Sequence, residues 1–265
     1  MEITLDTRKT LEQNAAIYFE KAKKAKKKIE GIKKALEQFR TEKEKLLKKK
    51  EKAVSKEKQK IQEKKEKKER QRAKQWYEKF HWFISSEGFL CIGGKDATTN
   101  EIIIKKHTDK KDVVFHTEAP GSPFFVIKTE GRLPGAATLN ETAIATASYS
   151  RAWKLGLSSV LAFYVSPEQV SKKAMAGEYL QKGSFMIYGK RVYSTVNLEL
   201  GIGVLPDNRV MGGPVEAVKK NCGKLAIVVQ GKMSKSDAAK KIQKIIGGEL
   251  DEIMSALPAG DFEIK

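Results

Sequence analysis

The N-terminal part of the chain carries a regular pattern of apolar positions. From Leu11 onward, apolar side chains recur at alternating steps of four and three, which places them along one seam of a coiled coil. Thr10 and Gln13 have the spacing of a capping box, so we expect the helix to begin there. The seam comprises Leu11, Ala15, Tyr18, Ala22, Ala25, Ile29, Ile32, Leu36 and Phe39, and Leu46 keeps its phase.

Beyond Lys48 the apolar positions become sparse, and two courses of the chain are open. No Gly or Pro occurs between Gly31 and Gly88, so one uninterrupted helix of about seventy residues is permitted, on the order of 105 Å long. A turn within residues 48–56 would instead give an antiparallel hairpin, with Ser55 capping its second helix. Matching the lengths of the two arms favours the hairpin with its tip in that range.

At Trp76 the pattern changes to short apolar runs separated by turn-forming residues, which predict strands. Residues 100–107 fit either a helix or a strand. Thr138 with Glu141 forms a predicted capping box, and Ser234 is a predicted cap of a later helix. Strands without regular alternation with helices predict an α+β class. The strand-like runs are at residues 80–84, 88–94, 113–117, 124–129, 160–166, 184–189, 198–205 and 224–231.

Charge is divided unevenly between the two expected domains, a basic coiled-coil arm at 1–75 and an α+β domain at 76–265. Residues 1–74 hold 27 basic and 13 acidic side chains, and residues 75–265 hold 25 and 20. Because many cations of the arm have no acidic neighbour to pair with, we expect a partner rich in negative charge, such as nucleic acid. A spacer whose charge serves solubility is the alternative.

Sequence motifs for covalent or metal chemistry are absent. Cys91 and Cys222 lie far apart without CxxC spacing, and His81, His107 and His116 show neither HxH nor HExxH spacing. No P-loop or GxSxG motif occurs. No run approaches the roughly 18 apolar residues of a membrane span, and the N-terminus lacks the pattern of a signal peptide. We therefore expect a cytoplasmic protein that is not an enzyme and uses no metal or cofactor.

Six stretches of the sequence, in this order, resemble the NFACT-R domain of the NFACT family. The upstream stretch "LDTRKTLEQNAAIYFEKAKKAKKKIEG" resembles the middle coiled coil of that family, which forms an antiparallel hairpin there. Together the stretches cover nearly the whole chain. The six are "WYEKFHWFISSEGFLCIGGKDATTNE", "VVFHTEAPGSPFFVIKTEG", "ASYSRAWKLG", "VSPEQVSKKAMAGEYLQKGSFMIYGKRVY", "LELGIGV" and "RVMGGPVEAV".

This resemblance implies a role in ribosome-associated quality control, with the large ribosomal subunit, rRNA and tRNA as partners. Full-length members also carry an NFACT-N domain and a helix-hairpin-helix region, where the family's residues for tRNA use and alanine tailing lie. No such sequence precedes Met1. The resemblance therefore implies either a short member or a C-terminal fragment, and the tailing function is not carried over to this chain.

A glycine turn provides the first candidate site. Gly93, Gly94, Lys95 and Asp96 match the Gly-Gly-basic-Asp signature of the family. Two glycines let backbone amides approach a phosphate, and Lys95 adds a point charge, so the turn is a candidate anion-binding site. The structural alternative is that Asp96 caps a helix beginning at Ala97.

Two basic pairs in predicted loops are the other candidate RNA contacts, Lys172 with Lys173 and Lys190 with Arg191. Lys and Arg contact phosphates, and neighbouring aromatic rings stack on unpaired bases. The candidate stacking residues are Tyr179, Tyr188 and Tyr193.

These observations lead to two hypotheses. The first is a noncatalytic RNA-binding module of a ribosome-associated quality control factor, which binds the large ribosomal subunit or tRNA at stalled complexes. The second is a protein-interaction scaffold whose coiled coil dimerises or docks a partner protein.

Overall fold

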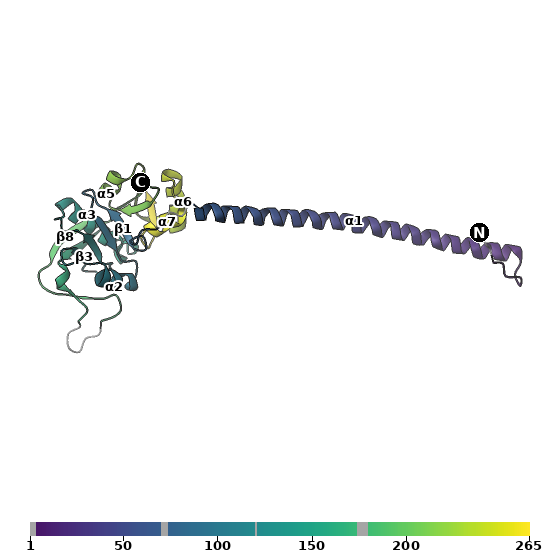
Figure 1. The fold of residues 1–265 in the computed structure, drawn as a ribbon, viewed down its shortest axis with the longest axis horizontal. Coiled ribbons are helices and arrows are strands. Elements are labelled where there is room, and N and C mark those ends of the chain that lie inside the picture. Colours follow the sequence, from purple (N-terminus) through teal and green to yellow (C-terminus); the bar gives the residue numbers. More distant parts are fainter. Residues whose placement is uncertain (1–3, 70–73, 120, 174–179) are drawn as a thin grey trace. The chain divides into compact units, whose positions relative to one another are not determined.

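A computed structural model describes residues 4–69, 74–119, 121–173 and 180–265 (Figure 1). Within the long N-terminal helix, side chains are described up to residue 43 and at residues 45 and 50. The chain divides into two units, Met1–Lys74 and Gln75–Lys265. We take each unit by itself.

The first unit is a single helix, α1 (Leu11–Glu69), preceded by a short N-terminal turn. The predicted capping box is confirmed, because the Thr10 amide donates to Gln13 Oε1 (3.1 Å) and the Gln13 amide donates to Thr10 Oγ1 (3.3 Å). Asn14, only 6% exposed, holds the preceding turn. Its side-chain amide donates to the Asp6 carbonyl (3.0 Å), and its oxygen accepts from the Asp6 amide (3.0 Å).

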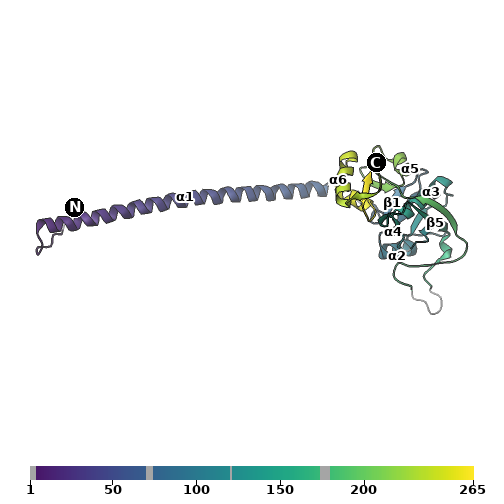
Figure 2. The ribbon, with the colours of Figure 1, turned by 180° about the vertical axis from the view of Figure 1, so that it is seen from behind.

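The turn expected within residues 48–56 is not found in the structure. The helix α1 continues through this range, as the uninterrupted alternative allows, and Figure 2 shows the same course from behind. The physical reason is composition, because Lys, Glu, Gln and Ala favour helix and no Gly or Pro interrupts them. The apolar seam is consequently exposed, with fractions of 53% at Ile29, 51% at Ile32, 54% at Leu36 and 70% at Phe39.

The second unit is built on a six-stranded antiparallel sheet with the spatial order β1-β2-β4-β3-β5-β8. Helix α3 (Ala136–Ser148) packs against β3, β5 and β8. The strand β8 is at an edge of this sheet, as Figure 1 shows. The strands are β1 (His81–Ile84), β2 (Leu90–Gly93), β3 (Val113–Thr117), β4 (Phe125–Lys128), β5 (Ser159–Val165) and β8 (Val192–Asn197).

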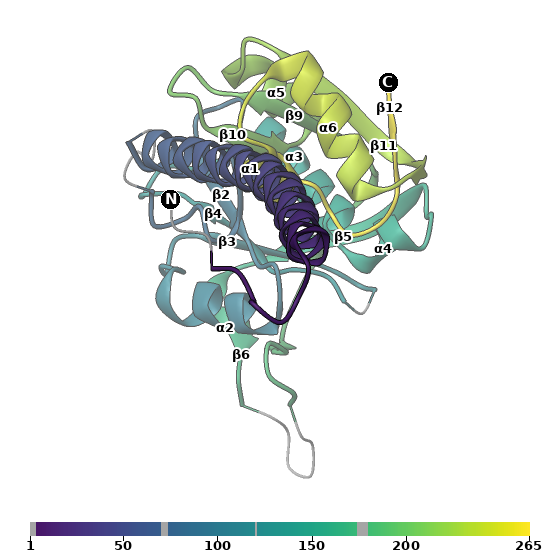
Figure 3. The same cartoon turned by 90° about the vertical axis from the view of Figure 1, so that its right-hand side faces the viewer.

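A second antiparallel sheet, with the order β10-β9-β11-β12, follows in the C-terminal part. Figure 3 shows α6 lying along this sheet. Ser234 caps α6 as predicted, because its hydroxyl accepts from the Asp237 amide (3.3 Å). The elements are β9 (Leu200–Val204), β10 (Val210–Gly213), α5 (Val215–Asn221), β11 (Leu225–Met233), α6 (Lys235–Ile246), α7 (Leu250–Ala256) and β12 (Phe262–Ile264).

Smaller elements complete this unit. The ambiguous residues 100–107 belong to a helix, α2, and the short strands β6 and β7 pair with each other. In Figure 3 the strand β6 lies beside α2. The bounds are α2 (Ala97–Lys106), α4 (Arg151–Lys154), a 3₁₀ turn (Pro167–Gln169), β6 (Val170–Ser171) and β7 (Met186–Ile187).

The apolar core explains the change in composition after residue 75. Trp82 and Phe83 on β1 are buried, as expected of strand residues that face a core. Antiparallel sheets with helices of varied placement make this an α+β fold, as the sequence predicts. The largest fully buried side chains include Phe80, Phe83, Phe115, Phe125, Trp153 and Phe262.

The predicted capping box of Thr138 and Glu141 is wrong. Helix α3 begins three residues earlier, with Gly135 instead of Thr138 at the N-cap position. Two amides at its N-terminus, those of Gly135 and Thr138, donate to a carboxylate from another segment, Glu87 Oε2 (3.1 Å each). Glu141 instead accepts from the Ser86 amide (2.9 Å). A long-range carboxylate therefore replaces the local cap.

Candidate nucleic-acid interface

The glycines of the Gly-Gly-Lys-Asp turn are required by close packing. A Cβ on Gly93 would overlap the ring of Phe125, and a Cβ on Gly94 would overlap the side chain of Asn100. The same Asn100 oxygen accepts from the Phe124 amide (3.1 Å), which ties α2 to the chain before β4. Both glycines therefore serve the junction of β2 with α2.

The backbone amides of this turn are engaged inside the chain. The Gly94 amide donates to the Phe124 carbonyl (3.1 Å), and the amides of Lys95 and Asp96 both donate to Thr99 Oγ1 (2.8 Å each). Asp96 caps α2, because its Oδ1 accepts from the Thr99 amide (2.8 Å). That hydrogen bond is the main reason why the pKa of Asp96 is lowered.

These contacts favour the structural alternative for the turn. An anion would find the three amides occupied and an ionised carboxylate beside them, so the structure offers no support for anion binding by Gly93, Gly94 and Asp96. Lys95 keeps an exposed side chain, and its Nζ donates to Ser255 Oγ on α7 (2.6 Å). Of this turn, only Lys95 remains a candidate RNA contact.

Lys172 is a structural cation of the segment that contains β6 and β7. Its Nζ donates to the carbonyls of Gln181 (2.9 Å) and Ser184 (3.0 Å). It also lies 5.0 Å from the centroid of the Phe185 ring. Because these contacts join the two ends of the segment, we expect Lys172 to hold its shape.

Arg191 is held in a similar way. Its Nη1 donates to Glu118 Oε1 (2.7 Å), and its guanidinium lies 4.8 Å from the centroid of the buried Phe163 ring. Glu118 also accepts from the Tyr193 hydroxyl (2.7 Å). Hydrogen bonds from Tyr193 and then from Arg191 lower the pKa of Glu118, so this carboxylate stays ionised beside the cation.

Lys173 and Lys190 differ from these two anchored cations. Both side chains are exposed, and within the described residues neither ammonium group forms an ion pair or a hydrogen bond. Only their backbones are fixed, because the Lys173 carbonyl accepts from the Tyr188 hydroxyl (3.2 Å) and the Lys190 carbonyl accepts from Gln169 Nε2 (3.0 Å). A rigid backbone with a solvent-facing cation is suited to a phosphate contact.

A further exposed cation, Lys182, belongs to the same surface. A Cβ on Gly183 would overlap the backbone of Ala97, so the loop around residue 183 packs on the first turn of α2. Lys182 is close enough to Asp96 to help lower the pKa of that carboxylate. Sequence reasoning missed Lys182 because its position depends on this packing. We call Lys95, Lys173, Lys182 and Lys190 the hairpin surface, after the antiparallel pair β6 and β7. The name does not refer to the hairpin predicted for the N-terminal arm.

Two of the three candidate stacking tyrosines have exposed rings. Tyr188 is 38% exposed and Tyr193 is 48% exposed, so both rings are accessible beside the hairpin surface. Tyr179 lies outside the described residues.

Two histidines and both cysteines of this unit are packed into its interior. His116 packs 4.4 Å from the Phe124 ring, and His81 stacks 4.0 Å from the Tyr149 ring. Burial lowers the pKa of both imidazoles. Burial also raises the pKa of the Cys91 thiol to about 12 and that of Cys222 to about 11, which keeps both thiols protonated. Within the described residues, no three such side chains are grouped to hold a metal ion.

Comparison with known proteins decides the family. Residues 79–189 match the family model described as the NFACT protein RNA binding domain. The archaeal Rqc2 homolog aRqcH of Methanocaldococcus jannaschii is 44% identical over 200 residues, which is 73% of this chain and 30% of that protein. The chain belongs to the NFACT family.

Other NFACT relatives extend beyond the archaea. The ribosome quality control complex subunit NEMF of Homo sapiens is 44% identical over 121 residues (45% of this chain and 11% of that protein). The ribosome quality control complex subunit 2 of Schizosaccharomyces pombe is 37% identical over 139 residues (51% and 13%). The chain thus spans less than a third of the length of these NFACT relatives. In the described part of the chain, no helix is both long and apolar enough to cross a bilayer.

Proposed function

We propose that this chain is an RNA-binding module of a ribosome-associated quality control factor, and that it binds the large ribosomal subunit or tRNA at stalled complexes. The observation that carries the proposal is the match of residues 79–189 to the NFACT protein RNA binding domain. Two of the relatives named above are subunits of the ribosome quality control complex, which supports the ribosome as the place of action.

The charge distribution supports the same function. The chain has a formal net charge of +19, which attracts polyanions. The hairpin surface supplies exposed cations on a fixed backbone, and Tyr188 and Tyr193 supply accessible rings beside them. Phosphate contacts from lysine with stacking on aromatic rings are the usual means of holding RNA with unpaired bases. We therefore assign the contact with RNA to this surface.

The test is a salt titration of binding to purified large ribosomal subunits or tRNA. Each phosphate contact that is lost reduces the slope of log K against log salt by about one. The double variant Lys173→Ala/Lys190→Ala is therefore expected to make this negative slope shallower by about two. A matched control, Lys232→Ala/Lys244→Ala, removes the same charge from β11 and α6 and is expected to leave the slope nearly unchanged. Equal slopes for all three proteins would refute the assignment.

A second candidate function rests on the exposed seam of α1. Ile29, Ile32, Leu36 and Phe39 are each more than half exposed on one stripe of the helix, which is typical of a helix that pairs with another helix. A scaffold that docks a protein through this stripe is therefore the alternative. It predicts that Ile32→Ser/Leu36→Ser abolishes ribosome association, whereas alanine at Lys173 and Lys190 leaves it intact.

A further inference from the structure

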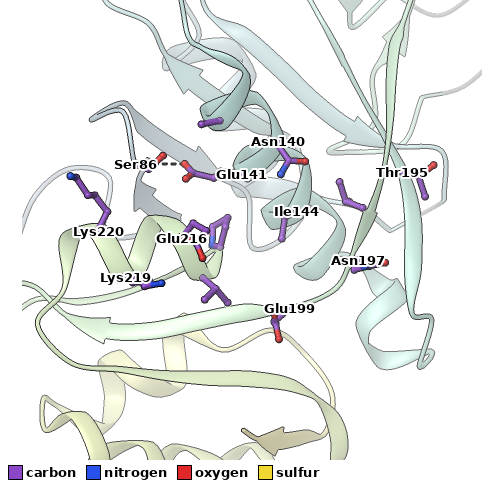
Figure 4. Close-up of a pocket in the computed structure, with 14 residues that line it drawn as sticks. Ser86, Asn140, Glu141, Ile144, Thr195, Asn197, Glu199, Glu216, Lys219 and Lys220 are labelled. Atoms are coloured by element: carbon purple, nitrogen blue, oxygen red, sulfur yellow. Dashed lines mark hydrogen bonds between the residues drawn. The ribbon is translucent and has the colours of Figure 1, made fainter.

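A pocket of about 950 Å³ lies away from the hairpin surface, between α3, the edge strand β8 and α5 (Figure 4). Sites that take small molecules commonly have volumes of about 300–1,000 Å³. Asn140, Glu141 and Ile144 have the spacing of one helical face and line the pocket from α3. The remaining walls come from β8 and α5, with Ser86 before β2, Glu199 after β8 and Pro214 before α5.

Glu141 forms the buried polar group of this pocket. It is 4% exposed, and its Oε2 accepts from the Ser86 amide (2.9 Å), the contact drawn in Figure 4. Burial raises its pKa, and the nearby carboxylates Glu87 and Glu216 raise it further. Within the described residues, no Lys or Arg forms an ion pair with Glu141. A desolvated carboxylate of this kind gains most from a ligand that brings N–H donors.

The last turn of α5 carries charge of the opposite sign, whereas the first turn of the same helix brings Glu216 to the pocket. Lys219 and Lys220 occupy the last turn of α5, line the pocket and are exposed. Within the described residues, neither forms an ion pair. Figure 4 shows Glu141 and the two lysines on different walls. The pocket therefore offers the acceptor of Glu141 on α3, a second carboxylate at Glu216, and two cations at the last turn of α5.

This arrangement restricts the class of ligand. A simple anion would meet the carboxylates of Glu141 and Glu216, and a simple cation would meet Lys219 and Lys220. A nucleotide satisfies both, because its base carries N–H donors at one end and its phosphate carries negative charge at the other. The side chains of Ile144, and of Val196 on β8, add apolar surface for the face of a base.

We propose that this pocket binds one unpaired nucleotide of RNA, with guanine preferred, its base against Glu141 and its phosphate toward Lys219 and Lys220. Guanine presents two adjacent donors, N1–H and the N2 amino group, which match the two oxygens of a carboxylate. The other bases place an acceptor beside their donor on that edge, and it would face the carboxylate. The inference rests on the proposed function, because it takes RNA as the ligand of this domain.

The experiment is an NMR titration of the full chain with 5′-GMP, 5′-AMP, 5′-CMP and 5′-UMP. We expect 5′-GMP to bind most tightly and to shift resonances of α3, β8 and α5. Glu141→Gln is expected to weaken 5′-GMP binding by about tenfold or more, since hydrogen bonds to a charged group are the stronger kind. Lys219→Ala is expected to weaken the binding of all four nucleotides to the same extent.

Matched variants control for general effects of charge. Glu168→Gln removes a carboxylate on the 3₁₀ turn, and Lys244→Ala removes a cation from the last turn of α6; both are expected to leave 5′-GMP binding unchanged. If Glu141→Gln does not fold, Lys219→Ala and Asn140→Ala carry the test. Equal affinities for the four nucleotides, or 5′-GMP binding that none of these pocket variants weakens, would overturn the proposal.

This titration is independent of the salt titration proposed for the hairpin surface. If 5′-GMP binds in the pocket but the chain does not bind ribosomal subunits or tRNA, the proposed function fails and the pocket stands. If the chain binds these RNAs in a salt-dependent way but no nucleotide enters the pocket, the proposed function stands and the inference fails.

Discussion

Replacing Arg191 with alanine is expected to destabilise the α+β unit, whereas the same change at the neighbouring Lys190 is not. The ion pair of Arg191 with Glu118 is partly exposed and contributes about 0.2–1 kcal/mol. The stacking on Phe163 adds about 0.5–1 kcal/mol. The expected loss for Arg191→Ala is therefore about 1–2 kcal/mol, and Lys190→Ala is expected to stay within about 0.5 kcal/mol.

Tryptophan fluorescence during urea or thermal unfolding reports on the α+β unit, because all three tryptophans of the chain lie beyond residue 75. For a unit of this size, about 1–2 kcal/mol corresponds to a Tm lower by about 2–8 °C. The contrary result would be an unchanged Tm for Arg191→Ala together with a loss of RNA binding equal to that of Lys190→Ala. Arg191 would then be a contact with RNA, and the division between anchored and solvent-facing cations would be incorrect.

Three further predictions concern single carboxylates. Asp96→Ala removes the cap of α2 and is expected to cost about 0.5–2 kcal/mol in urea unfolding; because the pKa of Asp96 is lowered in the fold, its stabilisation is present at neutral pH and is lost as pH falls below about 4. Asp112→Ala removes the buried partner of Lys128, which keeps its ion pair with Asp109, and a loss of about 1.5–3 kcal/mol is expected by the same method. Binding of 5′-GMP is expected to weaken as pH falls through the raised pKa of Glu141, at a higher pH than the ordinary value of about 4.3 for glutamate, and a pH-independent affinity from pH 7 to 4 would contradict the role of this carboxylate.

Local patterns were sufficient to predict much of the fold. The capping box at Thr10 and the cap at Ser234 depend only on neighbouring residues, and both are confirmed. The strand-like runs after Trp76 are likewise local, because apolar positions bounded by turn-forming residues specify a strand whatever its partner. Sheet order and pairing were not predicted, since they depend on contacts between distant segments.

The features that the sequence did not predict correctly depend on contacts between distant segments or on a balance between two alternatives. The cap of α3 comes from Glu87, far from that helix in the sequence. No local signal distinguishes Lys172 from Lys173, yet the carbonyls of Gln181 and Ser184 anchor only the first.

In the arm, the lysine-rich sequence is compatible with a turn or with a continuous helix. The hairpin was favoured by the lengths of its arms, and the structure has the continuous helix.

The central claim is that the hairpin surface contacts RNA, and ultraviolet crosslinking to purified large ribosomal subunits tests it most directly. After nuclease and protease digestion, mass spectrometry locates the residues that retain a nucleotide. We predict adducts on peptides that contain Lys173, Lys182, Tyr188 or Lys190. Adducts confined to the helix α1, or none on residues 75–265, would contradict it.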